Sequence, residues 1–170
     1  MADKAAPDAV TLLKEDHRRV EDLFKQFKKA EGNGSKQKLA EEICAELIVH
    51  TVIEEEIFYP ACEGKVEGDD LKEAYVEHDG AKVLIADISK GGPDDEYYEA
   101  KVKVLQEEIE HHVKEEEGRL HGIFAQAKRA GVDIDALGEE LAARQRELFA
   151  EIKEKGLPKP ELTTLEATKV

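Results

Sequence analysis

The chain has 170 residues, a length typical of one domain with a sizeable apolar core. Its 40 acidic residues outnumber its 25 lysines and arginines, and the resulting net charge of −15 argues against nucleic acid and anionic membranes as partners. The lack of tryptophan and a charged content of 38% favour an all-helical fold. No apolar run reaches membrane-spanning length, and residues 1–4 lack a signal-peptide core, so we expect a cytoplasmic protein.

The sequence predicts five helices. Pro7 and Asp8 suit the start of the first helix, and the glycine-rich segment 32–35 separates it from the second. The expected ranges are 8–31, 36–62, 69–89, from the turn at 91–95 to 129, and 134–155. This pattern predicts an all-α, up-down four-helix bundle (1–130), an accessory fifth helix (131–157) that packs outside the bundle or on a second subunit, and a mobile tail (158–170).

A histidine and a glutamate stand four residues apart in the second helix, at His50 and Glu54. Such positions share one helix face, and Leu47 and its apolar neighbours direct this face toward the core. A buried carboxylate needs a compensating charge, and because the chain offers no inward arginine here, a metal cation is the remaining partner. His112 and Glu116 repeat the arrangement in the fourth helix. The apolar residues expected on their face are Val102, Leu105, Ile109 and Leu120.

Two further histidines reveal an internal duplication. His17 lies 33 residues before His50, and His78 lies 34 residues before His112. The two halves are offset by 61 residues from His17 to His78 and by 62 from His50 to His112. A helical hairpin with one histidine on its first helix and His-x-x-x-Glu on its second therefore occurs twice.

The four helices together offer inward-facing donors, as in bundles whose cores hold carboxylate-bridged metal pairs. Each histidine taken alone is more often a hydrogen-bonded core residue, but the duplicated pattern favours metal ligation. A combination of imidazole and carboxylate ligands favours iron, and manganese or zinc less strongly. Six ligand residues do not fill the coordination positions of two ions, so positions stay open for a small exogenous ligand. The predicted metal ligands are His17, His50, Glu54, His78, His112 and Glu116.

Four motifs in the chain resemble the HHE cation-binding family, whose best-known members are the hemerythrins. The motifs are Glu15-Asp16-His17, the segment 50–60, Glu77-His78-Asp79 and the segment 111–117, and they cover about residues 10–130. The resemblance implies a four-helix bundle with a non-haem diiron centre bridged by an oxo or hydroxo group. In that picture Glu54 and Glu116 bridge the irons and the four histidines are terminal ligands.

Three features depart from the family pattern. Hemerythrins carry a further histidine where this chain has Lys82, whose long side chain can extend to solvent and is assigned no buried role. His121-Gly122 replaces the Phe-Pro pair with which the second glutamate-rich motif of the family usually ends. In the internal repeat His121 corresponds to Tyr59, and on a regular helix it lies about 180° from His112. Tyr59 and Tyr75 are expected at the edge of the core. The fifth helix is the third departure.

Several polar residues flank the predicted ligands. His111 lies about 100° from the ligand face and is expected to meet water. The neighbouring carboxylates are expected on the solvated flank, with a contact to a histidine N–H for any that turn inward. These carboxylates are Glu55, Glu56, Glu115 and Glu117.

The unsaturated ligand set predicts a diiron protein that binds or senses a small oxidant such as O₂, NO or peroxide, as in oxidative or nitrosative stress. Two alternatives stay open. One is a catalase- or peroxidase-like enzyme at the same centre, and the other is an iron-buffering stress-response protein whose metal stabilises the fold. The expected partner is a diatomic ligand or peroxide, without nucleic acid or membrane, and the protein is expected to be a monomer or homodimer.

Overall fold

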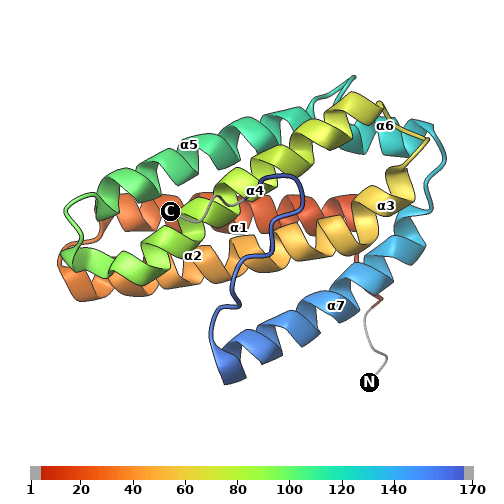
Figure 1. The fold of residues 1–170 in the computed structure, drawn as a ribbon. Helices are drawn as coiled ribbons and strands as arrows, with labels where there is room; N and C mark the ends of the chain where they lie inside the picture. The colour runs from red at the N-terminus through yellow and green to blue at the C-terminus, as the bar shows by residue number, and fades with distance from the viewer. Residues whose placement is uncertain (1–4, 167–170) are drawn as a thin grey trace.

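Four long helices form an antiparallel, up-down bundle (Figure 1). The structure is a computed structural model that describes residues 5–166, and it contains no strand in that range. The predicted all-α bundle with an additional C-terminal helix is confirmed. The bundle helices are α1 (Ala9–Lys29), α2 (Asn33–Ile53), α4 (Gly68–Gly91) and α5 (Tyr98–Glu117).

Shorter elements connect and extend these helices. α2 continues through a π-helical turn, η1 (Glu54–Phe58), into α3 (Tyr59–Cys62). A 3₁₀ turn, η2 (Gly92–Asp94), precedes α5. The chain then forms α6 (Ile123–Arg129) and α7 (Ile134–Lys155).

The apolar core is divided into two clusters. One contains Leu13 and Phe58 and extends to α6 and α7, and the other contains Val20, Leu47 and Leu105. Buried polar residues occur along the same helices, between the residues of the two clusters. Because buried polar groups need partners, this polar layer is the candidate functional region of the bundle. Its main members are His17, His50, Glu54, His78, His112 and Glu116.

The fifth long helix, α7, packs outside the bundle against α1 and α2. Leu141 is fully buried in the first core cluster. The approach is close at Gly138, where a Cβ atom would lie 2.1 Å from the carbonyl oxygen of Pro7. Of the two placements expected for this helix, the structure shows packing on its own bundle.

The fourth predicted helix does not continue to residue 129, so this prediction was wrong. α5 ends at Glu117 and a turn precedes α6. A Cβ atom on Gly122 would lie 2.4 Å from the backbone nitrogen of Gly118, which only glycine allows. Leu120, expected on the core face of a continuous helix, is 65% exposed. The glycine pair therefore ends the helix although apolar residues follow.

After α7 the chain crosses α4 in an extended segment, residues 157–166 (Figure 1). Three consecutive backbone N–H groups, of residues 163–165, donate to the carboxylate of Asp79 at 2.5–3.0 Å. These contacts restrain part of the segment for which mobility was predicted. Mobility stays a prediction, and residues 167–170 lie outside the described range.

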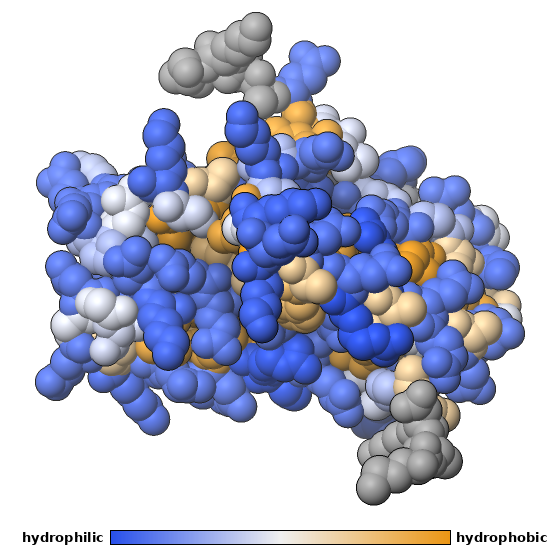
Figure 2. All heavy atoms as spheres, turned by 90° about the horizontal axis from the view of Figure 1, so that it is seen from below, coloured by the Kyte–Doolittle hydropathy of each residue, from blue (hydrophilic) through white to orange (hydrophobic). Residues whose placement is uncertain are grey.

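The surface agrees with the strongly negative composition. Hydrophilic side chains cover most of the face shown in Figure 2, and apolar side chains appear there as small, scattered patches. Within residues 5–166, every helix is too short or too polar to span a bilayer. The expectation about residues 1–4 concerns a part of the chain outside this range.

Candidate metal centre

All six predicted ligands lie in the polar layer, and none is more than 5% exposed. Each bundle helix contributes one histidine, and the rings form two pairs. The Nε2 atoms of His17 and His50 are 3.1 Å apart, and those of His78 and His112 are also 3.1 Å apart. The same nitrogen of every ring therefore faces the interior of the bundle.

Glu54 lies between the two histidine pairs. Its Oε2 atom is 3.3 Å from Nε2 of His50 in one pair and 3.3 Å from Nε2 of His78 in the other. The side chain is fully buried. A carboxylate in such a place costs several kcal/mol unless cationic or hydrogen-bonding partners surround it.

Glu116 spans the two pairs with separate oxygens. Oε2 is 3.2 Å from Nε2 of His17, and Oε1 is 3.5 Å from Nε2 of His112. Glu116 Oε2 and Glu54 Oε1 are buried without a hydrogen-bond partner. Orphaned carboxylate oxygens facing paired imidazole nitrogens are a donor set that fits transition-metal ions.

The charges of the layer compensate one another. Burial disfavours the charged imidazolium, but Glu116 and Glu77 outweigh it and raise the pKa of His112 to about 10. Burial likewise favours the neutral carboxyl of Glu116, yet His112 and His17 hold its pKa well below the ordinary value. Because histidine binds metal in its neutral form, a cation would take the place of these protons.

A seventh polar group, the hydroxyl of Tyr59, points into the layer. It donates to Glu116 Oε1 at 2.7 Å and lies 3.2 Å from His78 Nε2 and 3.5 Å from His112 Nε2. Tyr59 is fully buried, so its predicted place at the edge of the core was wrong. Its backbone N–H donates to the carbonyl of Glu54, five residues earlier, and the extra residue in this turn rotates the following side chains by about 100°.

Each histidine is held at its other ring nitrogen, Nδ1, by a carboxylate from a neighbouring helix. Such a contact fixes the tautomer that leaves Nε2 free for a metal. Every one of these carboxylates is adjacent in sequence to a residue of the polar layer, and the contacts run from α1 to α2, to α4, to α5 and back to α1. The pairs are Asp16 with His50 at 3.4 Å, Glu55 with His78 at 3.0 Å, Glu77 with His112 at 2.6 Å and Glu117 with His17 at 2.7 Å.

Comparison with known proteins agrees with this geometry. Residues 8–124 match the family model for the hemerythrin HHE cation-binding domain. The chain belongs to the hemerythrin HHE cation-binding family. Together with the buried histidine and glutamate clusters, the match makes this a metal-binding, hemerythrin-like protein.

Two individual proteins are similar to this hemerythrin-like chain. A solved structure of a hemerythrin HHE cation-binding domain-containing protein from Mycobacterium kansasii superimposes with a TM-score of 0.73 over 89% of this chain and 95% of that one. The two are 23% identical, so the likeness concerns the fold. A Nostoc sp. protein named DNA nickase is 26% identical over 119 residues, which are 70% of this chain. The chain covers 34% of that relative's length.

Lys82 occupies the position at which hemerythrins carry a further histidine, and it is buried at 4% exposure rather than extended to solvent. Its Nζ atom donates to the two carboxylate oxygens of Glu55 at 2.8 and 2.9 Å and to the carbonyl of Glu161 at 3.1 Å. The sequence assigned Lys82 no buried role, and the structure gives it one: Lys82 compensates the carboxylate that holds His78.

Sequence reasoning missed three residues at this hemerythrin-like centre. Asp16 and Glu77 carried a usable signal, since each directly precedes a histidine of the layer. Tyr59 carried none, because apolar periodicity does not reveal a π-helical turn. Its repeat counterpart His121 stays exposed, as α5 ends before reaching it, and His111 is exposed as predicted.

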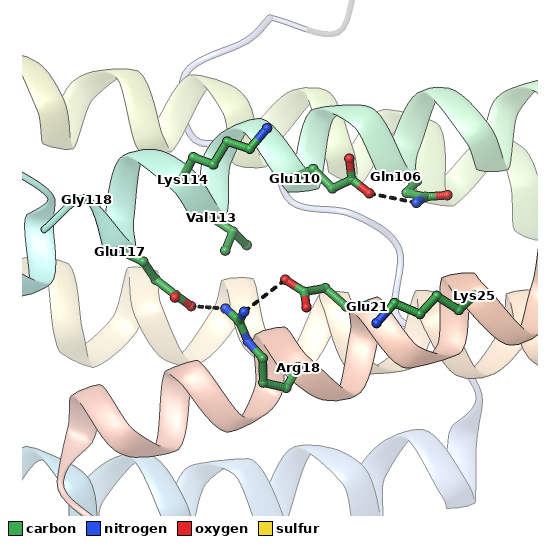
Figure 3. Close-up of a pocket in the computed structure, with 9 residues that line it drawn as sticks. All are labelled: Arg18, Glu21, Lys25, Gln106, Glu110, Val113, Lys114, Glu117 and Gly118. Carbon is green, nitrogen blue, oxygen red and sulfur yellow. Dashed lines mark hydrogen bonds and ion pairs between the residues drawn. The ribbon is translucent and has the colours of Figure 1, made fainter.

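A small cavity of about 20 Å³ adjoins the four histidines. It is enough for roughly one water-sized molecule. On the other side of Val113 a surface groove of about 520 Å³ runs between α1 and α5 (Figure 3). There Arg18 reaches across to Glu117, the carboxylate on Nδ1 of His17. The apolar residues lining the cavity are Val20, Leu47, Ile109 and Val113.

Proposed function

We propose that this protein holds two iron ions in its polar layer and binds a small oxidant, such as O₂, NO or peroxide, at that centre. The observation that carries the proposal is the pairing of the imidazole nitrogens across two buried carboxylates that each have an oxygen without a hydrogen-bond partner. Iron bound there would supply redox chemistry and an open position for an exogenous ligand.

The side chains divide the donors between two ions. His17 and His50 would hold one ion, and His78 and His112 would hold the other, with both glutamates shared. Tyr59 would be an additional ligand in the half-site of His78 and His112, since its hydroxyl lies beside both of these rings. The phenolic oxygen would thus supply a donor to the half-site of His78 and His112. This is the half-site in which hemerythrins have a further histidine where this chain has Lys82.

The cavity beside the histidines supports a ligand as small as O₂, NO or peroxide, each of which has two non-hydrogen atoms. Its volume of about 20 Å³ excludes larger organic substrates unless the helices move apart. Its apolar lining suits an uncharged diatomic molecule better than an ion. Val113 lies between the cavity and the surface groove, so shortening it to alanine should speed ligand binding.

The proposal is tested by loading the protein anaerobically with ferrous iron, measuring iron per chain, and then adding NO or air. We expect two ions per chain and new near-ultraviolet and visible absorption on exposure. An unchanged spectrum in protein that holds two irons would exclude oxidant binding. It would favour the iron-buffering alternative.

The enzymatic alternative makes a different prediction in the same preparation. Sustained release of O₂ from added peroxide over many turnovers, abolished by His112→Ala, would identify a catalase-like enzyme. A single stoichiometric reaction would identify a binding or sensing protein.

A further inference from the structure

Two histidine–glutamate pairs are interleaved on α5. His112 and Glu116 point into the polar layer, whereas His111 and Glu115, one residue earlier in each case, form the same i,i+4 pair on the outside of the helix. His111 Nε2 lies 3.1 Å from Glu115 Oε1. Taken alone, this would be an ordinary surface ion pair.

A carboxylate from α4 joins the outer pair to the inner centre. Glu77 Oε1 lies 3.6 Å from His111 Nε2, while its other oxygen, Oε2, lies 2.6 Å from His112 Nδ1. Donor atoms of Glu77, His111 and Glu115 all lie within 4.8 Å of one another. Ligands of a tetrahedral ion such as zinc stand roughly 3.3 Å apart, given metal–ligand distances of about 2.0–2.1 Å. The distances from His111 Nε2 to Glu115 Oε1 (3.1 Å) and to Glu77 Oε1 (3.6 Å) lie on either side of this spacing.

A surface hollow of about 280 Å³ connects this cluster with the buried centre. It is lined by Glu77 and Glu115 from the outer cluster and also by His112 and Glu116 from the polar layer. Glu116 is fully buried, and its Oε2 atom has no hydrogen-bond partner. Because His112 and Glu116 belong to the buried centre and also line the hollow, the hollow leads from the outer cluster to the buried donors.

The charge of the hollow favours cations. Two further acidic residues, Asp70 and Glu73, line it, against one lysine, Lys114. A concave surface with an excess of one sign concentrates ions of the opposite sign and raises their association rate. His121 also lines the hollow, without belonging to the cluster.

We propose that Glu77, His111 and Glu115 form a second, surface site for a divalent transition-metal cation, and that ions pass from it through the hollow to the buried centre. Imidazole with two carboxylates suits Zn²⁺, Fe²⁺ or Mn²⁺. The passage of ions rests on the proposed function, but the surface site can be tested without it.

The first test counts ions. Zn²⁺ is equilibrated by dialysis with the full-length protein, with His111→Ala and with Glu115→Gln. The wild type should bind one ion more than either variant. His121→Ala and Glu73→Gln remove a histidine and a negative charge from the same hollow outside the cluster, and these controls should keep the additional ion. Equal counts in the wild type and His111→Ala would overturn the proposal.

The second test measures uptake. Ferrous iron is mixed anaerobically with protein stripped by chelator, and iron bound per chain is followed with time. His111→Ala should fill the buried centre about tenfold more slowly, within the range by which focused charge changes association rates. It should reach the same final content in that centre, without the additional surface ion. Loading at the wild-type rate would overturn the passage of ions.

The two proposals fail in distinguishable ways. A wild type that binds one zinc ion, lost in His111→Ala, but never holds the buried pair would overturn the diiron proposal and support the surface site. Two buried ions in both proteins without an additional one would overturn the surface site alone.

Discussion

Tyr59 adds a phenol hydroxyl to the histidines and glutamates of this hemerythrin-like centre. Its hydroxyl contacts two carboxylates and two imidazoles of the polar layer at 2.7–3.5 Å. Burial, together with Glu116 and Glu54, raises the pKa of this phenol well above its ordinary value. Coordination to a ferric ion would oppose this shift, because a cation favours the phenolate.

The first prediction concerns this ligand role. Iron-loaded, air-exposed wild type should show a visible absorption band from phenolate-to-ferric charge transfer, and Tyr59→Phe should lose that band while still binding two ions. Tyr75→Phe is the matched control, since the ring of Tyr75 packs on Tyr59 at 5.3 Å without being among the hydrogen-bond partners of the layer. A band that survives in Tyr59→Phe would show that the phenol is not a ligand.

The second prediction concerns the carboxylates on Nδ1. Glu117→Gln weakens the contact that orients His17, and loss of such an outer partner typically lowers metal affinity about 10- to 100-fold. Competition with a chelator of known affinity measures the change. Glu110→Gln removes the same charge from the same helix, where its carboxylate contacts Gln106, and should leave affinity unchanged. An equal loss in both variants would indicate a general charge effect.

At the scale of elements, the apolar periodicity of the sequence correctly predicted which side chains face inward wherever the helix is regular. The face carrying His50 and Glu54 was predictable because both residues precede the irregular turn. The inward rotation of Tyr59 was not, because a π-helical turn inserts one residue without leaving a signal in the apolar pattern. The end of α5 was marked by Gly118 and Gly122, but the apolar residues after them concealed it.

The third prediction concerns the docking of α7. Gly138→Ala introduces a methyl group 2.1 Å from the Pro7 carbonyl oxygen, so α7 or the start of α1 must shift. Overpacking of this kind costs about 1–3 kcal/mol of the free energy of unfolding, which urea titration measures. Gly34→Ala is the control: nothing lies within 4 Å of its Cβ, and alanine in a helix should be neutral or stabilising. A Gly138→Ala protein as stable as the control would contradict the close packing.

For the whole molecule, the sequence predicted the bundle and the convergence of six side chains, because the duplicated spacing fixes which helix faces meet. It did not predict the inward Lys82 or the path of residues 157–166 over α4. Both depend on long-range pairing: Lys82 with Glu55, and Asp79 with the backbone N–H groups of residues 163–165. A single-sequence pattern contains no information about which distant carboxylate such a group will meet.

The last prediction concerns the pH dependence of stability. The pKa of His112 is raised from 6.5 to about 10, and that of His50 is also raised, in spite of burial, by neighbouring carboxylates. A histidine with a raised pKa in the folded state contributes its full stabilisation below pH 6.5 and loses it as the pH rises toward 10. Chelator-treated protein should therefore melt at progressively lower temperature from about pH 7 to pH 10.

Iron-loaded protein should show a smaller decline over the same range, because its imidazoles already bind metal in their neutral form. Thermal unfolding followed by circular dichroism at several pH values, with and without chelator, measures both curves. His112→Gln cannot titrate, so its chelator-treated form should show a shallower decline than the wild type. Identical curves for the loaded, stripped and substituted proteins would mean that the charges of the polar layer are not coupled to folding.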